Sequence, residues 1–307
     1  MAGAPLFDQR PPFDRVRLAA RLAGLARANV LVGTSSWKYP GWLGQVYTRE
    51  PYLARGVFSQ KRFEAGCLAE YALTFPVVCG DFTFYQFPSE PYWRRLFSPV
   101  PGLKFAFKVP QQITAKAFPS SYLDTAMLDD LFLGPLDAWR PQVAALIVEF
   151  GTFSHASYAG LRDFLRDLDR FLAALPRRFR YAVEIRNPEF FEPDYFRCLR
   201  AHGVAHVFNA WTRSPSLADQ LRLPDPFTAD FTVCRALLRR GRPYEQAVAL
   251  FSPYEDLKDP NPEGRQGIRE LIDAARRNER AAFLFVNNRF EGNAPLTIEA
   301  IVGDDVN

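Results

Sequence analysis

The amino-acid sequence predicts an α/β protein, and the number of its apolar runs favours a single (β/α)8 barrel, the TIM barrel. Eight short apolar runs lie between residues 30 and 287, and helical stretches separate most neighbouring runs. Several runs are almost continuously apolar, as parallel strands covered by helices are. A doubly wound open sheet shows the same alternation, so periodicity alone leaves both folds open. Open sheets that bind nucleotides often carry a glycine-rich phosphate loop. The sequence has neither G-x-G-x-x-G after the first run nor G-x-x-x-x-G-K-[ST], so this fold has no motif in its support.

The expected strands are rich in β-branched and aromatic residues and are bounded by polar or turn-forming residues. They cover residues 30–35, 77–84, 104–109, 143–150, 181–186, 205–210, 231–237 and 282–287. The chain of 307 residues is long enough for one barrel of this size or for two medium domains. Neither a linker nor an internal repeat divides it, and we therefore expect one barrel domain over residues 29–303.

The expected helices lie between these strands and show apolar residues on one side. They cover residues 62–73, 91–97, 125–139, 158–175, 193–201 and 264–278. The clearest is 158–175, in which Leu161, Phe164, Leu168 and Phe171 share a face opposite arginines and aspartates. Residues 215–229 contain three prolines and predict a loop with one short helix.

The first 28 residues predict an N-terminal extension that carries one extra helix. Residues 15–28 are amphipathic, with Val16, Leu18, Leu22 and Leu25 on the apolar side. Residues 2–10 contain an acidic residue and no apolar core, which disfavours a signal peptide. A mitochondrial presequence is the competing interpretation, and acidic residues at positions 8 and 14 count against it.

Composition restricts the chemistry. Apolar residues make up 48% and charged residues 23% of the chain, and the net charge of +4 is far below that of a dedicated nucleic-acid binder. The longest apolar runs have six residues, whereas a membrane span needs about 20. Four cysteines without a C-x-x-C pair and only three histidines disfavour structural zinc and disulfides, and they fit a reducing cytosol. No cofactor is predicted; a metal, if bound, would rest on carboxylates and water, which favours Mg²⁺ or Mn²⁺.

Polar residues gather at the carboxyl ends of the expected strands, where βα-barrels build their sites. The candidate catalytic residues are Glu184, Lys108 and Glu149. The candidate ligand-binding residues are Trp37, Tyr85, Asp81, Arg186, Asn209, Trp211, Arg235, Asn287 and Asn288. Such a set predicts a small-molecule site at one end of the barrel.

Each group also has a structural interpretation. Glu184 and Arg186 lie two apart on one strand face, so they can form an ion pair with each other or with Lys108. The aromatic residues can form a ligand-binding wall or simply pack. The two asparagines after the last strand can cap a loop and the next helix. Glu149 and Glu184 end neighbouring strands and can act as general acid and base or hold a divalent cation.

Five segments in order carry a family resemblance. They are Val30-Leu-Val-Gly-Thr-Ser-Ser-Trp-Lys-Tyr-Pro-Gly-Trp42, Asp81-Phe-Thr-Phe-Tyr85, Phe105-Ala-Phe-Lys-Val-Pro110, Ala182-Val-Glu-Ile-Arg-Asn-Pro188 and Val286-Asn-Asn288. With these segments the chain resembles the YecE-like family, the domain of unknown function 72 (DUF72), over roughly residues 30 to 300. The resemblance implies a TIM barrel whose mouth is lined by Trp37, Tyr85, Lys108, Glu184, Arg186 and Asn288.

The chain departs from the family pattern at three places. Cys79 stands where an acidic residue is common, Glu149 where the family often has glutamine, and Arg235-Ala-Leu-Leu where Arg-x-His-Gly is expected. These changes suggest a distinct subfamily. The family's activity is not established, so the resemblance implies no reaction. Its likeness to metal-dependent endonuclease and sugar-isomerase barrels is an analogy of fold alone.

Three functions remain open from the sequence. The favoured one is binding of a small polar or anionic ligand, phosphate- or sugar-like, at the barrel mouth. Lys108, Arg186 and Arg235 would then hold an anion, and Glu184 or Glu149 would move protons. The alternatives are a nucleic-acid or nucleotide-processing barrel, whose basic and aromatic mouth could stack bases, and a non-catalytic binding or regulatory barrel. We expect a cytoplasmic protein without a membrane partner; the sequence predicts no oligomeric state.

Overall fold

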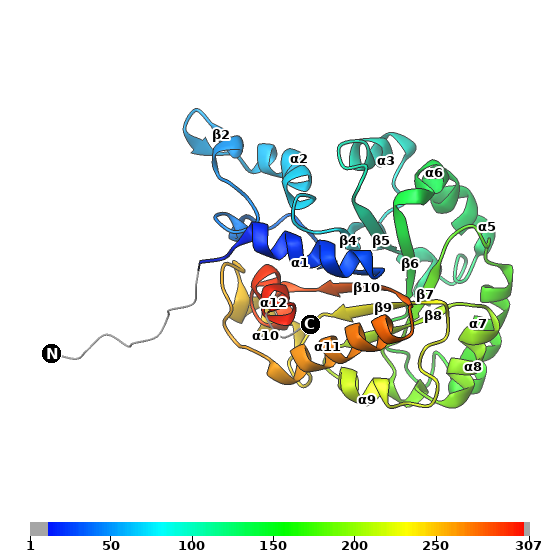
Figure 1. The fold of residues 1–307 in the computed structure, drawn as a ribbon. Helices are drawn as coiled ribbons and strands as arrows, with labels where there is room; N and C mark the ends of the chain where they lie inside the picture. The colour runs from blue at the N-terminus through cyan, green and yellow to red at the C-terminus, as the bar shows by residue number, and fades with distance from the viewer. Residues whose placement is uncertain (1–11, 304–307) are drawn as a thin grey trace.

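The computed structural model describes residues 12–303, and eight parallel strands in this part of the chain close into a barrel (Figure 1). The strands are β1 (Val30–Thr34), β4 (Val77–Gly80), β5 (Lys104–Lys108), β6 (Val143–Glu149), β7 (Tyr181–Glu184), β8 (Ala205–Ala210), β9 (Phe231–Ala236) and β10 (Ala281–Val286). They follow one another around the barrel in chain order, and β1 pairs with both β4 and β10. The predicted (β/α)8 barrel is confirmed and the doubly wound open sheet is excluded.

Alternation of side chains along each strand builds two apolar layers. Val77 and Cys79 join the cluster of buried residues that fills the barrel, whereas Val78 joins the cluster between strands and helices. On β6, Ile147 belongs to the first cluster and Val148 to the second. Because successive side chains point to opposite faces of a strand, both faces need apolar residues. The nearly continuous apolar runs of the sequence follow from this requirement.

Helices form the outer layer around the strands (Figure 1). The longer ones are α1 (Arg15–Arg27), α2 (Gln60–Tyr71), α3 (Glu90–Phe97), α7 (Leu161–Ala174), α8 (Pro193–Ala201), α10 (Tyr244–Phe251), α11 (Pro262–Arg277) and α12 (Ala294–Ile301). The predicted face of α7 is buried at Phe164, Leu168 and Phe171. Over residues 12–303, no helix has both the length and the apolar character needed to cross a membrane.

The N-terminal helix α1 adds its apolar side to the outer layer. Leu18, Leu22 and Leu25 are buried there, and Asp14 caps the helix by accepting a hydrogen bond from the backbone N–H of Arg17. Val16, predicted on the same side, is 78% exposed, because its offset of two residues from Leu18 turns it about 200° around the helix axis, to the opposite side. The prediction about a signal peptide concerns residues 2–10, which lie outside the described part of the chain.

Two predicted elements differ most from the structure in their extent. The second strand ends at Gly80 and not at residue 84, because a 3-10 turn follows over Asp81–Phe84. The Thr83 hydroxyl stabilises this turn by donating to the carbonyl oxygens of Gly80, at 3.1 Å, and Lys108, at 2.6 Å. The predicted helix over 125–139 is divided into α5 (Thr125–Leu128), a π-helical turn (Asp129–Leu133), α6 (Gly134–Leu136) and a 3-10 helix (Asp137–Gln142). A Gly-Pro pair at 134–135 favours this break, because proline lacks the N–H that a continuous helix needs.

Several observed elements have no counterpart in the prediction. They are α10, α12, α4 (Gln111–Thr114) and a hairpin of β2 (Leu53–Ala54) and β3 (Val57–Phe58). Arg55 and Gly56 both have positive φ angles, as in the two-residue turn that joins such strands. The short helix expected within 215–229 is α9 (Leu217–Leu221).

The seam between β1 and β4 is held partly by a side chain. Only Thr34 and Val78 pair directly across it. The Tyr71 hydroxyl accepts a hydrogen bond from the Thr34 N–H at 3.0 Å and lies 2.9 Å from the carbonyl oxygen of Val77, to which it donates. Tyr71 therefore replaces ladder hydrogen bonds where the two strands are least paired.

Candidate functional site

Six charged side chains meet at the carboxyl end of the barrel, and we call them the mouth cluster. Its members are Asp81, Lys108, Glu149, Glu184, Arg186 and Arg235. They come from the ends of β5, β6 and β7, from the residues that follow β4 and β7, and from β9. All are sequence-predicted site residues. Because parallel strands present their carboxyl ends on one face of a barrel, closure brings them together.

Arg235 connects the three carboxylates. Its Nη1 lies 2.5 Å from Glu184 Oε2 and also donates to Glu149 Oε2, while its Nη2 lies 3.0 Å from Asp81 Oδ1. The Arg235 side chain is only 3% exposed. β9 is a direct neighbour of neither β4 nor β6, so this side chain must extend across the interior of the barrel. Arg235 is therefore the centre of the mouth cluster.

Glu149 is surrounded by positive charge. Its Oε1 lies 3.1 Å from Lys108 Nζ, and its Oε2 lies 3.3 Å from Arg186 Nη2 and also contacts Arg235. Burial by itself raises the pKa of Glu149, but the charges of Arg186, Arg235 and Lys108 outweigh it and hold this pKa well below its usual range. In this arrangement Glu149 stays ionised at neutral pH and is a weak proton acceptor.

Aromatic rings contact two of the cations. The Arg186 guanidinium lies over the ring of Trp211 at 4.0 Å, and Lys108 Nζ lies 3.7 Å from the centre of the Phe84 ring. Arg186 also contacts Glu184 Oε1 through Nη2 at 2.8 Å, whereas its buried Nη1 has no hydrogen-bond partner within residues 12–303. Phe84 was not predicted as a site residue, although it stands in the segment Asp81–Tyr85 that the sequence analysis singled out. The neighbouring Tyr85 is 68% exposed and its ring lies 5.3 Å from that of Phe84.

The other predicted residues are not brought into the mouth cluster. The ring of Trp37 is buried edge-on against Phe82 and Phe105, and its Nε1 has no hydrogen-bond partner among the described residues. Asn209 is fully buried and bonded to Ser214 and Gln220.

The asparagines after β10 organise the following backbone. Asn287 Oδ1 accepts from the N–H of Arg289 at 2.9 Å. Asn288 Oδ1 accepts from Trp42 Nε1 at 3.2 Å and from the N–H of Ala294, the first residue of α12, at 2.8 Å. These contacts match the capping roles that the sequence left as an alternative.

Cys79, one of the three departures from the family pattern, lies next to the mouth cluster. Cys79 is buried in the barrel, and its thiol lies 3.7 Å from Asp81 Oδ1. Burial raises the pKa of this thiol well above its usual value, and the charge of Asp81 raises it further. Cys79 is therefore a protonated, weak donor to Asp81 and not a thiolate nucleophile.

A cavity of about 310 Å³ lies beside Trp211. It is lined by residues after β8, after β9 and at the start of α11, among them Ser214, Arg239 and Asn261. Trp211 therefore stacks on Arg186 and also lines this cavity. The cavity extends the candidate site away from the mouth cluster.

The mouth carboxylates fit a divalent cation poorly. Glu149, Glu184 and Asp81 are each in contact with at least one guanidinium or ammonium group at hydrogen-bond distance. A magnesium or manganese ion would have to displace these positive charges. The mouth cluster therefore does not fit a divalent cation.

The chain is similar in sequence to one described protein family. The model of the family described as "Protein of unknown function DUF72" matches residues 31–304. The YecE protein of Escherichia coli (strain K12) is 28% identical over 186 residues, which span 58% of this chain and 58% of that protein.

Two solved structures of DUF72 family proteins share the fold. The one from Thermotoga maritima is 21% identical, with a TM-score of 0.64, and the match covers 89% of this chain and 97% of that chain. The one from Enterococcus faecalis is 16% identical, with a TM-score of 0.60 and the same coverage of 89% and 97%. At these identities the likeness concerns the fold alone.

Proposed function

Because this chain belongs to DUF72, a family of proteins of unknown function, we propose its function from the chemistry of its own barrel mouth. The proposal is that the mouth binds a small polyhydroxylated ligand of the sugar class. The observation that carries it is the balanced mouth cluster, in which three cationic and three anionic side chains pair with one another. Such a cluster offers fixed donors and acceptors without an excess of either charge.

A ligand with neutral hydroxyl groups suits this cluster. A hydroxyl both donates to a carboxylate and accepts from a guanidinium or ammonium group, so it can bind between paired charges without separating them. An anionic group such as a phosphate would instead meet cations whose charges the carboxylates already neutralise. The rings of Trp211 and the exposed Tyr85 supply apolar surface of the kind that sugar faces pack on.

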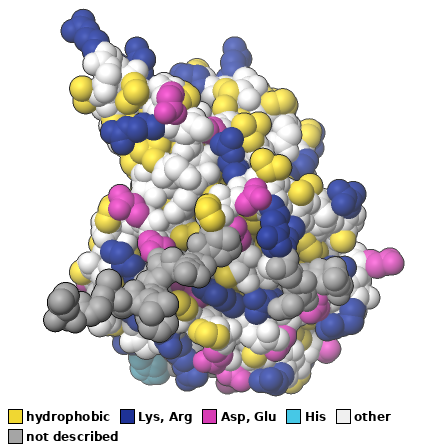
Figure 2. All heavy atoms as spheres, turned by 60° about the vertical axis from the view of Figure 1, so that its left-hand side comes forward, with side chains coloured by type: hydrophobic (Ala, Val, Ile, Leu, Met, Phe, Trp, Pro, Cys, Tyr) yellow, Lys and Arg dark blue, Asp and Glu magenta, His cyan; other side chains and the backbone are white. Residues whose placement is uncertain are grey.

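A polynucleotide is the weaker candidate. In the face drawn in Figure 2, lysine and arginine side chains are spread among acidic and apolar ones and form no continuous basic surface. Affinity for nucleic acid depends mainly on many cation–phosphate contacts. The pairing of Lys108, Arg186 and Arg235 with carboxylates leaves the mouth without such an excess of positive charge.

The mouth cluster could support acid–base chemistry by Glu184, Lys108 and Glu149 only after a bound ligand has replaced some of its ion pairs. Glu184 is fully buried and contacts both Arg186 and Arg235. A group held in two such contacts transfers a proton only when one of them is exchanged for a substrate atom. We therefore propose ligand binding as the function and assign no reaction.

Binding is tested with a panel of neutral sugars, sugar phosphates and inorganic phosphate, measured by calorimetry and by the shift of the unfolding midpoint. We expect a neutral sugar to bind the wild type, and Lys108→Ala and Glu184→Gln to bind it at least about tenfold more weakly, a loss of about 1.4 kcal/mol. Lys104→Ala is the matched control, because Lys104 lies on the same strand at its opposite end. We expect its affinity to equal that of the wild type.

The possible outcomes separate the candidates. Equal affinity of Lys108→Ala, Glu184→Gln and wild type would show that the mouth is not the binding site. Binding of sugar phosphates and phosphate without neutral sugars would favour an anionic ligand. DNA affinity that falls steeply with salt would support the nucleic-acid alternative.

A further inference from the structure

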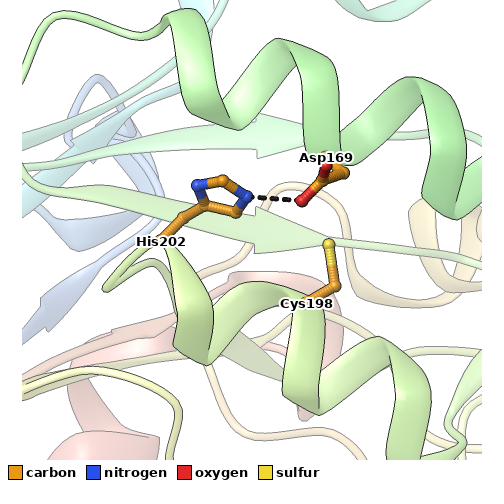
Figure 3. Close-up of side chains that lie close together, drawn as sticks. All are labelled: Asp169, Cys198 and His202. Carbon is orange, nitrogen blue, oxygen red and sulfur yellow. Dashed lines mark hydrogen bonds and ion pairs between the residues drawn. The ribbon is translucent and has the colours of Figure 1, made fainter.

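A second group of reactive side chains lies on the outer wall of the barrel. Asp169 comes from α7, Cys198 from α8, and His202 follows directly after α8 (Figure 3). A carboxylate oxygen, the thiol sulfur and an imidazole nitrogen of these residues all lie within 4.8 Å of one another. His202 Nε2 is 2.7 Å from Asp169 Oδ1. This group is separate from the mouth cluster in sequence and in composition.

The position of the group in the fold places it away from the mouth. In a βα-barrel each helix leads from the carboxyl end of one strand back to the amino end of the next. His202 caps the C-terminal end of α8, and β8 begins three residues later at Ala205. His202 is therefore near the amino ends of the strands, whereas the mouth cluster is at the carboxyl ends.

The local structure explains why the three side chains converge. Cys198 and His202 are four residues apart, so they lie on the same side of α8, one turn from each other. Asp169 lies on α7, which packs beside α8. Arg177 donates to the carbonyl oxygen of His202 at 2.5 Å, and this contact holds the end of α8 in place.

We propose that Asp169, Cys198 and His202 bind a zinc ion. Thiolate, imidazole and carboxylate are the three ligand types that Zn²⁺ takes in proteins. With metal–ligand bonds of about 2.0–2.3 Å and tetrahedral angles, the ligand atoms would lie about 3.3–3.6 Å apart. Three protein ligands leave the fourth position to water.

Small side-chain movements reach this geometry. The His202–Asp169 contact of 2.7 Å would have to lengthen, and the remaining separations of up to 4.8 Å would have to shorten. The side chain of Asp169 is 62% exposed and can rotate without disturbing the core. The His202 side chain is largely buried, so the imidazole is already oriented.

A catalytic triad is the competing interpretation, and the geometry disfavours it. In Figure 3 the Cys198 sulfur and the Asp169 carboxylate both lie on the Nε2 side of the His202 ring. A nucleophile and an orienting carboxylate need opposite nitrogens of the imidazole. Burial, with the charge of Asp169 as a further cause, also raises the pKa of the Cys198 thiol to about 11, which is the reverse of an activated thiolate.

Metal binding would replace a proton. The zinc–sulfur bond forms as the Cys198 S–H bond breaks, and the proton passes to solvent or buffer. His202 binds as the neutral imidazole through Nε2, and Asp169 binds as the carboxylate. The metal would then join α7 to α8 and stabilise the folded chain by mass action.

The test uses the whole chain after removal of metals with a chelator, and Co²⁺ as a spectroscopic probe of the site. We expect one Co²⁺ per chain, with a sulfur-to-cobalt charge-transfer band and the visible bands of tetrahedral cobalt. Zn²⁺ should displace the Co²⁺ and raise the unfolding midpoint. Cys198→Ala should abolish the charge-transfer band, and Asp169→Asn and His202→Gln should weaken Co²⁺ binding at least about tenfold.

His155→Gln is the matched control, because His155 is an exposed histidine in the loop after β6. It should bind Co²⁺ as the wild type does. Cys198→Ser serves as a second variant if the alanine packs poorly, and circular dichroism verifies the fold of each variant. The proposal is overturned if cobalt binds without the sulfur band, if the band persists without Cys198, or if His202→Gln binds as tightly as His155→Gln. It is also overturned if Co²⁺ and Zn²⁺ do not bind at all.

Discussion

Arg235→Ala is expected to lower the free energy of unfolding by about 3–5 kcal/mol, because removal of one partner leaves buried charges uncompensated. Arg235 contacts Asp81, Glu149 and Glu184 at once, and it is almost completely buried. Without it, Glu184 would keep Arg186 as a partner, but Asp81 would lose its contact with this guanidinium. Equilibrium unfolding in urea measures the loss.

The matched control is Arg166→Ala. The Arg166 side chain is 58% exposed, and its partners Asp163 and Asp167 lie on the same helix. An exposed ion pair of this kind contributes about 0–1 kcal/mol. A loss at Arg235 no larger than the loss at Arg166 would show that the mouth cluster does not stabilise the fold.

The pH dependence of the free energy of unfolding shows whether Arg235→Ala destabilises the fold through the lost charge or only through the cavity that it leaves. In the wild type the pKa of Glu149 is lowered on folding, so its contribution to stability is present above the unfolded pKa of about 4.3 and is lost as pH falls toward the folded pKa. In Arg235→Ala one opposing charge is gone, and burial shifts the pKa of Glu149 upward relative to the wild type. The folded variant then takes up protons at higher pH than the folded wild type. The stability difference should therefore narrow as pH falls from neutral through the folded pKa of Glu149 in the variant toward that in the wild type, whereas a cavity alone would give a constant difference.

Gly33→Ala is expected to lower the free energy of unfolding by about 3 kcal/mol or more, at the upper end of the cost of overpacking. A Cβ at this position would lie 1.8 Å from the carbonyl oxygen of Val77 and 3.1 Å from the Tyr71 hydroxyl. The first contact is with backbone, which cannot rotate away as a flexible side chain can. The substitution would therefore separate β1 from β4 at the seam that closes the barrel.

The matched control is Gly102→Ala, because a Cβ at Gly102 would meet no atom within 4 Å. Its free energy of unfolding should stay within about 0.5 kcal/mol of the wild type. Thermal or urea unfolding of both variants makes the comparison. If Gly33→Ala is as stable as Gly102→Ala, the close approach of β1 and β4 is not required for barrel closure.

Most strands could be predicted because burial on both faces is a local requirement. Each strand needs apolar residues at consecutive positions, and this pattern is visible without knowledge of the neighbours. The prediction was wrong after Gly80, where the turn over Asp81–Phe84 is also rich in aromatic residues. The turn depends on hydrogen bonds from Thr83, one of them to Lys108 on the next strand, and sequence periodicity does not reveal such a contact.

The composition of the mouth cluster could also be predicted, but its pairing could not. Lys108, Glu149 and Glu184 end neighbouring parallel strands, so their meeting follows from the fold class. The reach of Arg235 across the barrel to Glu149 depends on the closed cross-section of the strands. Likewise, Asn209 ends a strand in the predicted way, yet it bonds to Ser214 and Gln220 because the loop after β8 folds back over it.

Three features follow from the amino-acid pattern alone: the order of strands and helices, the end of the barrel where charged residues gather, and the resemblance to DUF72. Barrel closure sets which of those charges neutralise one another. Packing of helices also brings Asp169 beside Cys198 and His202, from which it is distant in sequence. Backbone conformation and the pattern of buried faces depend on residues close in sequence. The contacts among these charged and reactive side chains depend instead on barrel closure and on the packing of α7 against α8.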